Sequence, residues 1–112
     1  MSITTSTFKI TDHKKDSFRI DINGSLTGTE ALLLRDKVNQ CINSDYDTIY
    51  IDAKNVIEID LSGINEVINA HYTLEKVSKK LIFVYKKNSA VETWVETTGL
   101  DKFVDTAIVP AS

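Results

Sequence analysis

TIYIDAKNVIEIDLSG, residues 48–63, is the stretch of this 112-residue sequence that decides how the chain folds. It opens with a short apolar run of the kind found in strands inside a sheet, and a long helical pattern follows it. A second apolar run comes after the helix, and this order predicts a β-α-β crossover. We therefore expect residues 47–53 and 81–86 to be neighbouring parallel strands, joined by a helix over residues 62–80.

Ser62 stands at the start of this predicted helix. The first backbone N–H groups of a helix lack partners, and the helix dipole is positive there. A serine at such a position often caps the helix, which is the simplest interpretation of these residues alone. The position also suits a phosphate or another anion, and a charge added there changes the surface locally.

The rest of the chain alternates between strand-like and helical patterns. We expect strands at residues 8–10, 18–22, 47–53, 81–85 and 103–109, and helices at residues 29–42, 62–80 and 90–97. The order β-β-α-β-α-β-α-β predicts the α/β class, a mixed β-sheet with helices packed on it. Residues 1–112 are expected to form a single domain with an ordered core over about 7–109, and residues 1–6 and 110–112 are expected to be frayed.

Local signals support these boundaries. Residues 11–16 are polar and predict a hairpin loop between the first two strands. Thr27 with Glu30, and Ser89 with Glu92, have the spacing of capping boxes at helix starts. Residues 23–25 are expected to end the second strand, and Gly99 is expected to end the third helix.

Composition narrows the class of protein. The chain is 42% hydrophobic and 26% charged, as globular domains are. Its net charge of −3 argues against nucleic acid as the main partner. No apolar run reaches the roughly 18 residues that span a membrane, so no membrane insertion is expected. The first residues have neither a basic start nor an apolar segment, so we expect no signal peptide and a cytoplasmic protein. Cys41 is the single cysteine, so we expect no internal disulfide.

Nucleophilic and metal-dependent catalysis find little support. His13 and His71 have no partners at metal-ligand spacing. A serine-hydrolase pair of Ser62 and His71 fails, because nine residues of one helix separate them by about 13.5 Å and half a turn. The sequence around Ser62 also lacks the G-x-S-x-G elbow.

Two further patterns have simpler explanations. Asp52, Glu58 and Asp60 form an acidic group, but acidic residues are favourable near a helix start and are expected to be solvated. The glycines of residues 24–29 resemble a phosphate loop, but the required lysine is missing, so they are expected to serve a turn. We therefore expect that the protein is not an enzyme and that it has no catalytic residue, metal site or cofactor.

The predicted second helix has an apolar strip outside its inner face. The inner face is set by Gly63, Val67, Ala70, Leu74, Val77 and Leu81. At 100° per residue, Ile64, Ile68 and Tyr72 lie about 100–180° from its centre, with Ile64 close enough to reach the edge of the core. Together with Leu61, these residues would suit a protein-binding surface, or a neighbouring loop would cover them.

Several short motifs follow one another in a fixed order. They are Gly24-x-Leu26, Ile49-Tyr50-Ile51-Asp52, the segment from Val56 to Ile64, Leu81-Ile82-Phe83-Val84 and Thr98-Gly99-Leu100. In this order the chain resembles the STAS domain family of anti-sigma factor antagonists, from about Phe8 to Val109. The signature of that family is Asp-Ser-(Ser/Thr)-Gly at the start of the second helix. Asp60, Ser62 and Gly63 match it, whereas Leu61 replaces a small polar residue.

The resemblance implies a partner-switching regulator in which Ser62 is the phosphorylated residue. The unphosphorylated protein would bind a serine-kinase anti-sigma factor or a related switch kinase, and a phosphatase would reset it. The expected partner-binding residues are Gly24, Leu26, Asp60, Leu61, Ser62, Gly63, Ile64, Ile68 and Tyr72. Other STAS proteins suggest two alternatives, which are a subunit of a lipid-transport ATPase complex and a sensor domain that binds a nucleotide or another small ligand.

Overall fold

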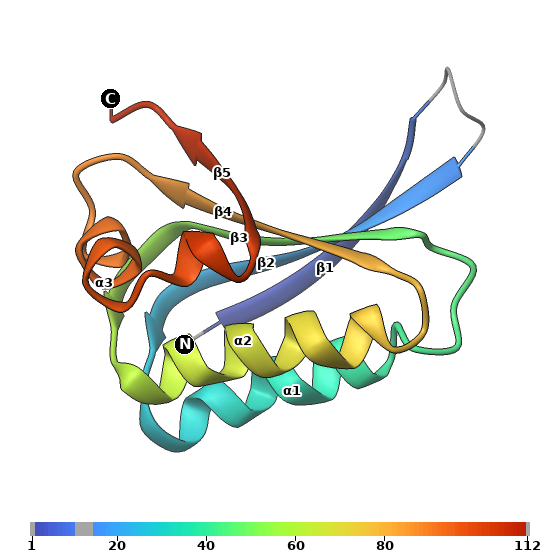
Figure 1. The fold of residues 1–112 in the computed structure, drawn as a ribbon, viewed down its shortest axis with the longest axis horizontal. Coiled ribbons are helices and arrows are strands. Elements are labelled where there is room, and N and C mark those ends of the chain that lie inside the picture. The colour runs from blue at the N-terminus through green and yellow to red at the C-terminus, as the bar shows by residue number, and fades with distance from the viewer. Residues whose placement is uncertain (1, 11–14, 112) are drawn as a thin grey trace.

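The computed structural model describes residues 2–10 and 15–111, which form one sheet with helices packed on it (Figure 1). The strands are β1 (Ser2–Ile10), β2 (Lys15–Leu26), β3 (Thr48–Ile59), β4 (Lys80–Lys86) and β5 (Asp105–Val109). The α-helices are α1 (Leu32–Asn39), α2 (Leu61–Glu75) and α3 (Ala90–Thr98), and two 3-10 helices are η1 (Gly28–Ala31) and η2 (Leu100–Lys102). The predicted α/β class and element order are confirmed.

The sheet has the strand order β1-β2-β3-β4-β5. β1 is antiparallel to β2, and all other neighbours are parallel. β3 therefore lies at the centre of the sheet, as its apolar run predicts. It pairs with β4, and α2 connects the two strands as a crossover. The parallel arrangement predicted for residues 47–53 and 81–86 is confirmed.

Alternating burial shows that the helices cover one face of the sheet. In β4, Leu81, Phe83 and Tyr85 are buried, while Ile82 and Val84 are partly exposed. The buried side chains belong to one core that also includes the inner residues of all three α-helices. α1 and α2 lie beside each other under the sheet (Figure 1).

Several strand boundaries differ from the prediction. β1 begins at Ser2, so the prediction that residues 2–6 are frayed is wrong, because this segment pairs with β2 along its length. Of the predicted hairpin loop, residues 11–14 lie outside the described residues, and residues 15 and 16 belong to β2. β2 also continues past residues 23–25, because its pairing with β3 absorbs register shifts there. Gly24 supplies the positive φ of 93° at this irregular point.

The predicted second helix is too long, because it ends at Glu75 rather than at residue 80. Ser78 has a φ of 61°. The Lys79 N–H donates to the Leu74 carbonyl at 2.9 Å and the Ser78 N–H to the Glu75 carbonyl at 3.0 Å, which together form a Schellman motif. Val77 is therefore exposed instead of lying on the inner face. A serine occupies the place where glycine usually signals this ending.

The first helix is also shorter than predicted, since α1 ends at Asn39 and is preceded by η1. Thr27 precedes η1 without a side-chain capping bond, so the predicted capping box with Glu30 is wrong. The box at α3 is confirmed in part: Ser89 Oγ accepts from the Glu92 N–H at 3.3 Å, but Glu92 accepts from the Asn88 N–H.

The end of the chain follows the prediction more closely. Gly99, with a φ of 71°, ends α3 as predicted. The last strand begins at Asp105 instead of Phe103, because η2 and the turn that follows it occupy residues 100–104.

Gly63 lets α2 approach the end of β2 closely. A Cβ atom at this position would lie 2.3 Å from the Leu26 carbonyl oxygen and 2.8 Å from Ile59 Cγ1. A backbone oxygen cannot move aside as a flexible side chain can, so only glycine fits here.

We expect Gly63→Ala to lower the free energy of unfolding by about 1–3 kcal/mol, because the added methyl group overpacks this contact. Urea denaturation measures this change. The matched control is Asn65→Ala, an exposed position on the same turn, with an expected change within about 0.5 kcal/mol. A Gly63→Ala variant as stable as the control would contradict the close contact.

Candidate functional site

Asp60 organises the start of α2. Its Oδ1 accepts a hydrogen bond from the Gly63 N–H, and its Oδ2 accepts one from the Gly28 N–H, each at 3.1 Å. Asp60 is therefore the N-cap of α2, and the interpretation of Ser62 as the cap is wrong. A carboxylate at the residue before the helix reaches the third helical N–H group, which leaves Ser62 within the first turn.

Ser62 is the second residue of α2, and it is exposed. Its hydroxyl makes no hydrogen bond with the residues that the structure describes. It lines an open groove between α2 and the η1–α1 segment, which we call the Ser62 groove. The residues that line this groove are Gly28, Thr29, Leu32, Arg35, Ser62, Asn65, Glu66 and Asn69.

The predicted partner-binding residues divide by exposure. Leu61 and Tyr72 expose 56% and 47% of their surface, so both are available to a partner. Ile68 is partly buried against the core. Ile64 is only 1% exposed, so it belongs to the edge of the core, as the sequence allowed, and its side chain is not available to a partner.

The burial of Ile64 has a geometric cause. Viewed down the helix axis at 100° per residue, the buried residues of α2 cover an arc of about 160°. Glu66 lies at one edge of this arc, Gly63 in its interior and Ile64 at the other edge. The arc is this wide because α2 packs against β3 and β4 and also against α1 and η1. The predicted apolar strip is therefore interrupted, with Leu61 at the start of α2 and Tyr72 three turns later.

Three other predicted partner-binding residues, Gly24, Leu26 and Gly63, offer no exposed side chain. Leu26 and Gly63 are buried, and Gly24 is partly exposed at the irregular point of β2. Leu26 and Gly63 contact each other, so they position the start of α2. Their role is to support Leu61 and Ser62 from below.

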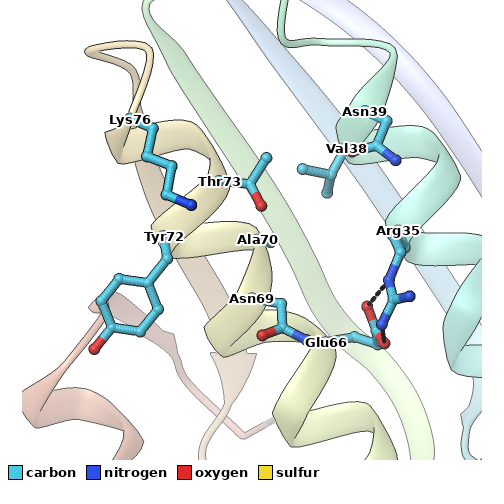
Figure 2. A pocket seen from close by; sticks show the side chains of 9 residues that line it. All are labelled: Arg35, Val38, Asn39, Glu66, Asn69, Ala70, Tyr72, Thr73 and Lys76. Carbon is cyan, nitrogen blue, oxygen red and sulfur yellow. Dashed lines mark hydrogen bonds and ion pairs between the residues drawn. The ribbon is translucent and has the colours of Figure 1, made fainter.

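An ion pair between α1 and α2 was not predicted from the sequence. Arg35 Nε lies 3.1 Å from Glu66 Oε1, and Arg35 Nη2 lies 2.6 Å from Glu66 Oε2, so the pairing is bidentate (Figure 2). The Glu66 side chain is 7% exposed and the Arg35 side chain 52%. The hydrogen bonds and charge of Glu66 raise the pKa of Arg35. A glutamate one turn before the inner Ala70 was the signal available in the sequence.

This ion pair also borders a second hollow on the same side of the molecule (Figure 2). We call it the Tyr72 groove. It is lined by Arg35, Val38, Asn39, Glu66, Asn69, Ala70, Tyr72, Thr73 and Lys76. Arg35, Glu66 and Asn69 line both grooves, so the two form one continuous surface along α1 and α2.

The other candidate groups are separated in space or already paired. Asp52 is held by Lys54, whose backbone N–H and Nζ lie 3.0 and 3.1 Å from its oxygens, while Asp60 caps α2. His71 Nε2 lies 3.5 Å from Glu75, near the far end of α2 from Ser62. His13 lies outside the described residues. Within residues 2–10 and 15–111, no three potential metal ligands come together, and no helix is long and apolar enough to cross a membrane.

The structure is similar to solved anti-sigma factor antagonists. SpoIIAA in its unphosphorylated form has 18% identity and a TM-score of 0.69 over 97% of this chain and 89% of that chain. An anti-sigma factor antagonist from Mycobacterium paratuberculosis has 20% identity and a TM-score of 0.73 over 94% and 85%. The Bacillus cell fate determinant SpoIIAA in its phosphorylated form has 18% identity and a TM-score of 0.66 over 99% and 92%. At these identities the likeness shows a shared fold.

The sequence itself gives the family. No curated protein matches it at a significant level. The model of the STAS domain family matches residues 9–110, almost the whole chain. This match confirms the resemblance seen in the motifs around Asp60, Ser62 and Gly63. The chain therefore belongs to the STAS domain family.

Proposed function

We propose that this protein is a phosphorylation-controlled partner-switching regulator of the anti-sigma factor antagonist type. Its unphosphorylated form binds a serine-kinase anti-sigma factor or a related switch kinase in the cytoplasm. The observation that carries this proposal is the exposed Ser62 hydroxyl on the first turn of α2 in a STAS domain. The similar fold of SpoIIAA, solved in unphosphorylated and phosphorylated forms, supports it.

The switch acts through charge on a fixed surface. Phosphorylation of Ser62 adds about 1.5–2 negative charges two residues after the Asp60 cap and next to Leu61, whose side chain is exposed. A partner that covers Leu61 must then remove the phosphate from water or face its charge, and either effect weakens binding. The Asp60 cap is already formed without the phosphate, so the domain keeps its fold.

The two proteins divide the chemistry between them. The kinase supplies ATP, magnesium and the base that accepts the proton of the Ser62 hydroxyl, and a phosphatase removes the phosphate afterwards. The antagonist supplies an accessible hydroxyl and the contact surface around it. Incubation with a purified anti-sigma serine kinase and ATP, followed by mass spectrometry, tests the modification directly, with the Ser62→Ala variant as the control. The absence of phosphate on Ser62 would argue against the kinase switch.

Variants of Ser62 separate charge from structure. We expect Ser62→Ala to keep the affinity for the kinase and to change the free energy of unfolding by no more than about 0.5 kcal/mol, because Asp60 supplies the cap. Ser62→Asp should fold and bind the kinase at least several-fold more weakly. Isothermal titration calorimetry measures the affinity and urea denaturation the stability.

The control for added charge is Thr93→Asp, an exposed position on α3 outside both grooves. This variant should bind the kinase as the wild type does. If Ser62→Asp and Thr93→Asp have equal affinities, the effect is not local to Ser62, and the charge mechanism is wrong.

Leu61 and Tyr72 test the apolar part of the contact. We expect Leu61→Ala and Tyr72→Ala each to weaken kinase binding. The expected loss of binding free energy is about 2 kcal/mol for a residue at the centre of the interface. Because both side chains are exposed, the free energy of unfolding should change by about 0.5 kcal/mol or less. Ile68 is a poor probe, since truncating a residue packed on the core also lowers stability.

The matched control for the aromatic residue is Phe103→Ala, since Phe103 is exposed to a similar degree but lies after η2, outside both grooves. It should leave binding unchanged. Unchanged affinity in both Leu61→Ala and Tyr72→Ala would place the kinase contact elsewhere on the domain.

A further inference from the structure

The Arg35–Glu66 ion pair lies close to Ser62 on the same surface. Ser62 and Glu66 are four residues apart on α2, so they lie one above the other on the same side of the helix. Arg35 reaches Glu66 from α1, and all three residues line the Ser62 groove. A phosphate on Ser62 would therefore enter a groove that already holds a guanidinium group.

Arg35 keeps donors available while it is paired. A guanidinium group has five N–H donors, and Glu66 engages only Nε and Nη2. The remaining donors make no hydrogen bond with the residues that the structure describes. Half of the Arg35 side chain is exposed, so an oxygen anion in the Ser62 groove has access to it.

We propose, building on the phosphorylation of Ser62 proposed above, that Arg35 binds the phosphate on Ser62 while it stays paired with Glu66. The remaining guanidinium N–H groups donate to the phosphate oxygens, so the phosphate is tied across the groove to α1. The phosphate then occupies part of the Ser62 groove and adds charge to it. Arg35 is thereby the positioning residue for the modified serine.

Arg35 stays paired with Glu66 because Glu66 is buried. The Glu66 side chain is 7% exposed, and leaving its carboxylate without a partner would strand a charge away from water. An exposed phosphate gains comparatively little from capturing Arg35 outright, because water screens the attraction. Sharing the planar guanidinium satisfies both anions, since its donors point in more than one direction.

Few other charges face the phosphate. Among the residues that line the Ser62 groove, Arg35 is the cation and Glu66 the anion, and the others are neutral. Asp60 adds a negative charge at the start of α2, and Glu30 lies in the neighbouring η1. The negative charges of Asp60, Glu30 and Glu66 would raise the second pKa of a phosphate on Ser62, and the positive charge of Arg35 would lower it.

The titration of the phosphate therefore tests the contact. Phosphoserine is placed at position 62 during translation, and its second pKa is measured by phosphorus NMR. Glu66→Gln serves as the background, because it leaves no stranded carboxylate when Arg35 is changed. In that background, we expect Arg35→Gln to raise the second pKa of the phosphate by about half a unit or more.

The matched control is Lys37→Gln in the same background, which removes an equal charge from another side of α1. It should leave the phosphate pKa nearly unchanged. An effect of Arg35→Gln no larger than that of Lys37→Gln would overturn the proposal. In the protein with Glu66 intact, the Arg35 Nε–H signal should keep its position on phosphorylation, and a shift to that of a free guanidinium would show that the pairing with Glu66 is lost.

This experiment needs neither the kinase nor a partner, so its outcome is independent of the proposed function. If phosphorylation of Ser62 weakens kinase binding but the phosphate pKa does not respond to Arg35, the proposed function stands and this inference fails. If the pKa responds but no kinase modifies Ser62, the contact is real and the proposed function fails.

Discussion

The carboxylate of Asp60 is the interaction on which this end of the structure depends. One oxygen accepts from the Gly63 N–H and starts α2, and the other accepts from the Gly28 N–H at the start of η1. β2 and β3 end side by side, with Leu26 opposite Ile59, so a single side chain joins the segments that leave two parallel strands. Without it, the partly buried Gly63 N–H would lose its partner in the protein, and the exposed Gly28 N–H would be left to water.

The position of Ser62 follows from this cap and from the contact beneath it. Gly63 fixes α2 against the Leu26 carbonyl, where no larger residue fits. With the inner side of the first turn set in this way, Leu61 and Ser62 face outward at its start. A hydroxyl held by a rigid turn can accept a charged group without reordering the chain, which is what the proposed switch requires.

α1 and the Arg35–Glu66 pair complete the surface. The ion pair links the two helices that border both grooves, so the candidate site spans segments more than 30 residues apart in the sequence. The partner contact proposed around Leu61 and Tyr72 lies along the same helices. The proposed charge mechanism and the proposed apolar contact therefore use one surface, so a change at Ser62 is expected to affect both.

The sequence by itself determined the class of fold, the parallel pairing of β3 with β4 and the family, because strand and helix periods and the motif at Asp60, Ser62 and Gly63 are local signals. Which residue caps α2 depended on where the helix begins, and whether Ile64 faces a partner or the core depended on how α2 packs on the sheet and on α1.

Only the tertiary structure could decide these points. A helical period gives the centre of the buried face but not its width, which is set by how many neighbours the helix has. The helical period places Glu66 near the inner Ala70, but its partner Arg35 lies 31 positions away, so no local pattern contains the pair. The sequence therefore located Ser62, and the packing of α1 on α2 decided what surrounds it.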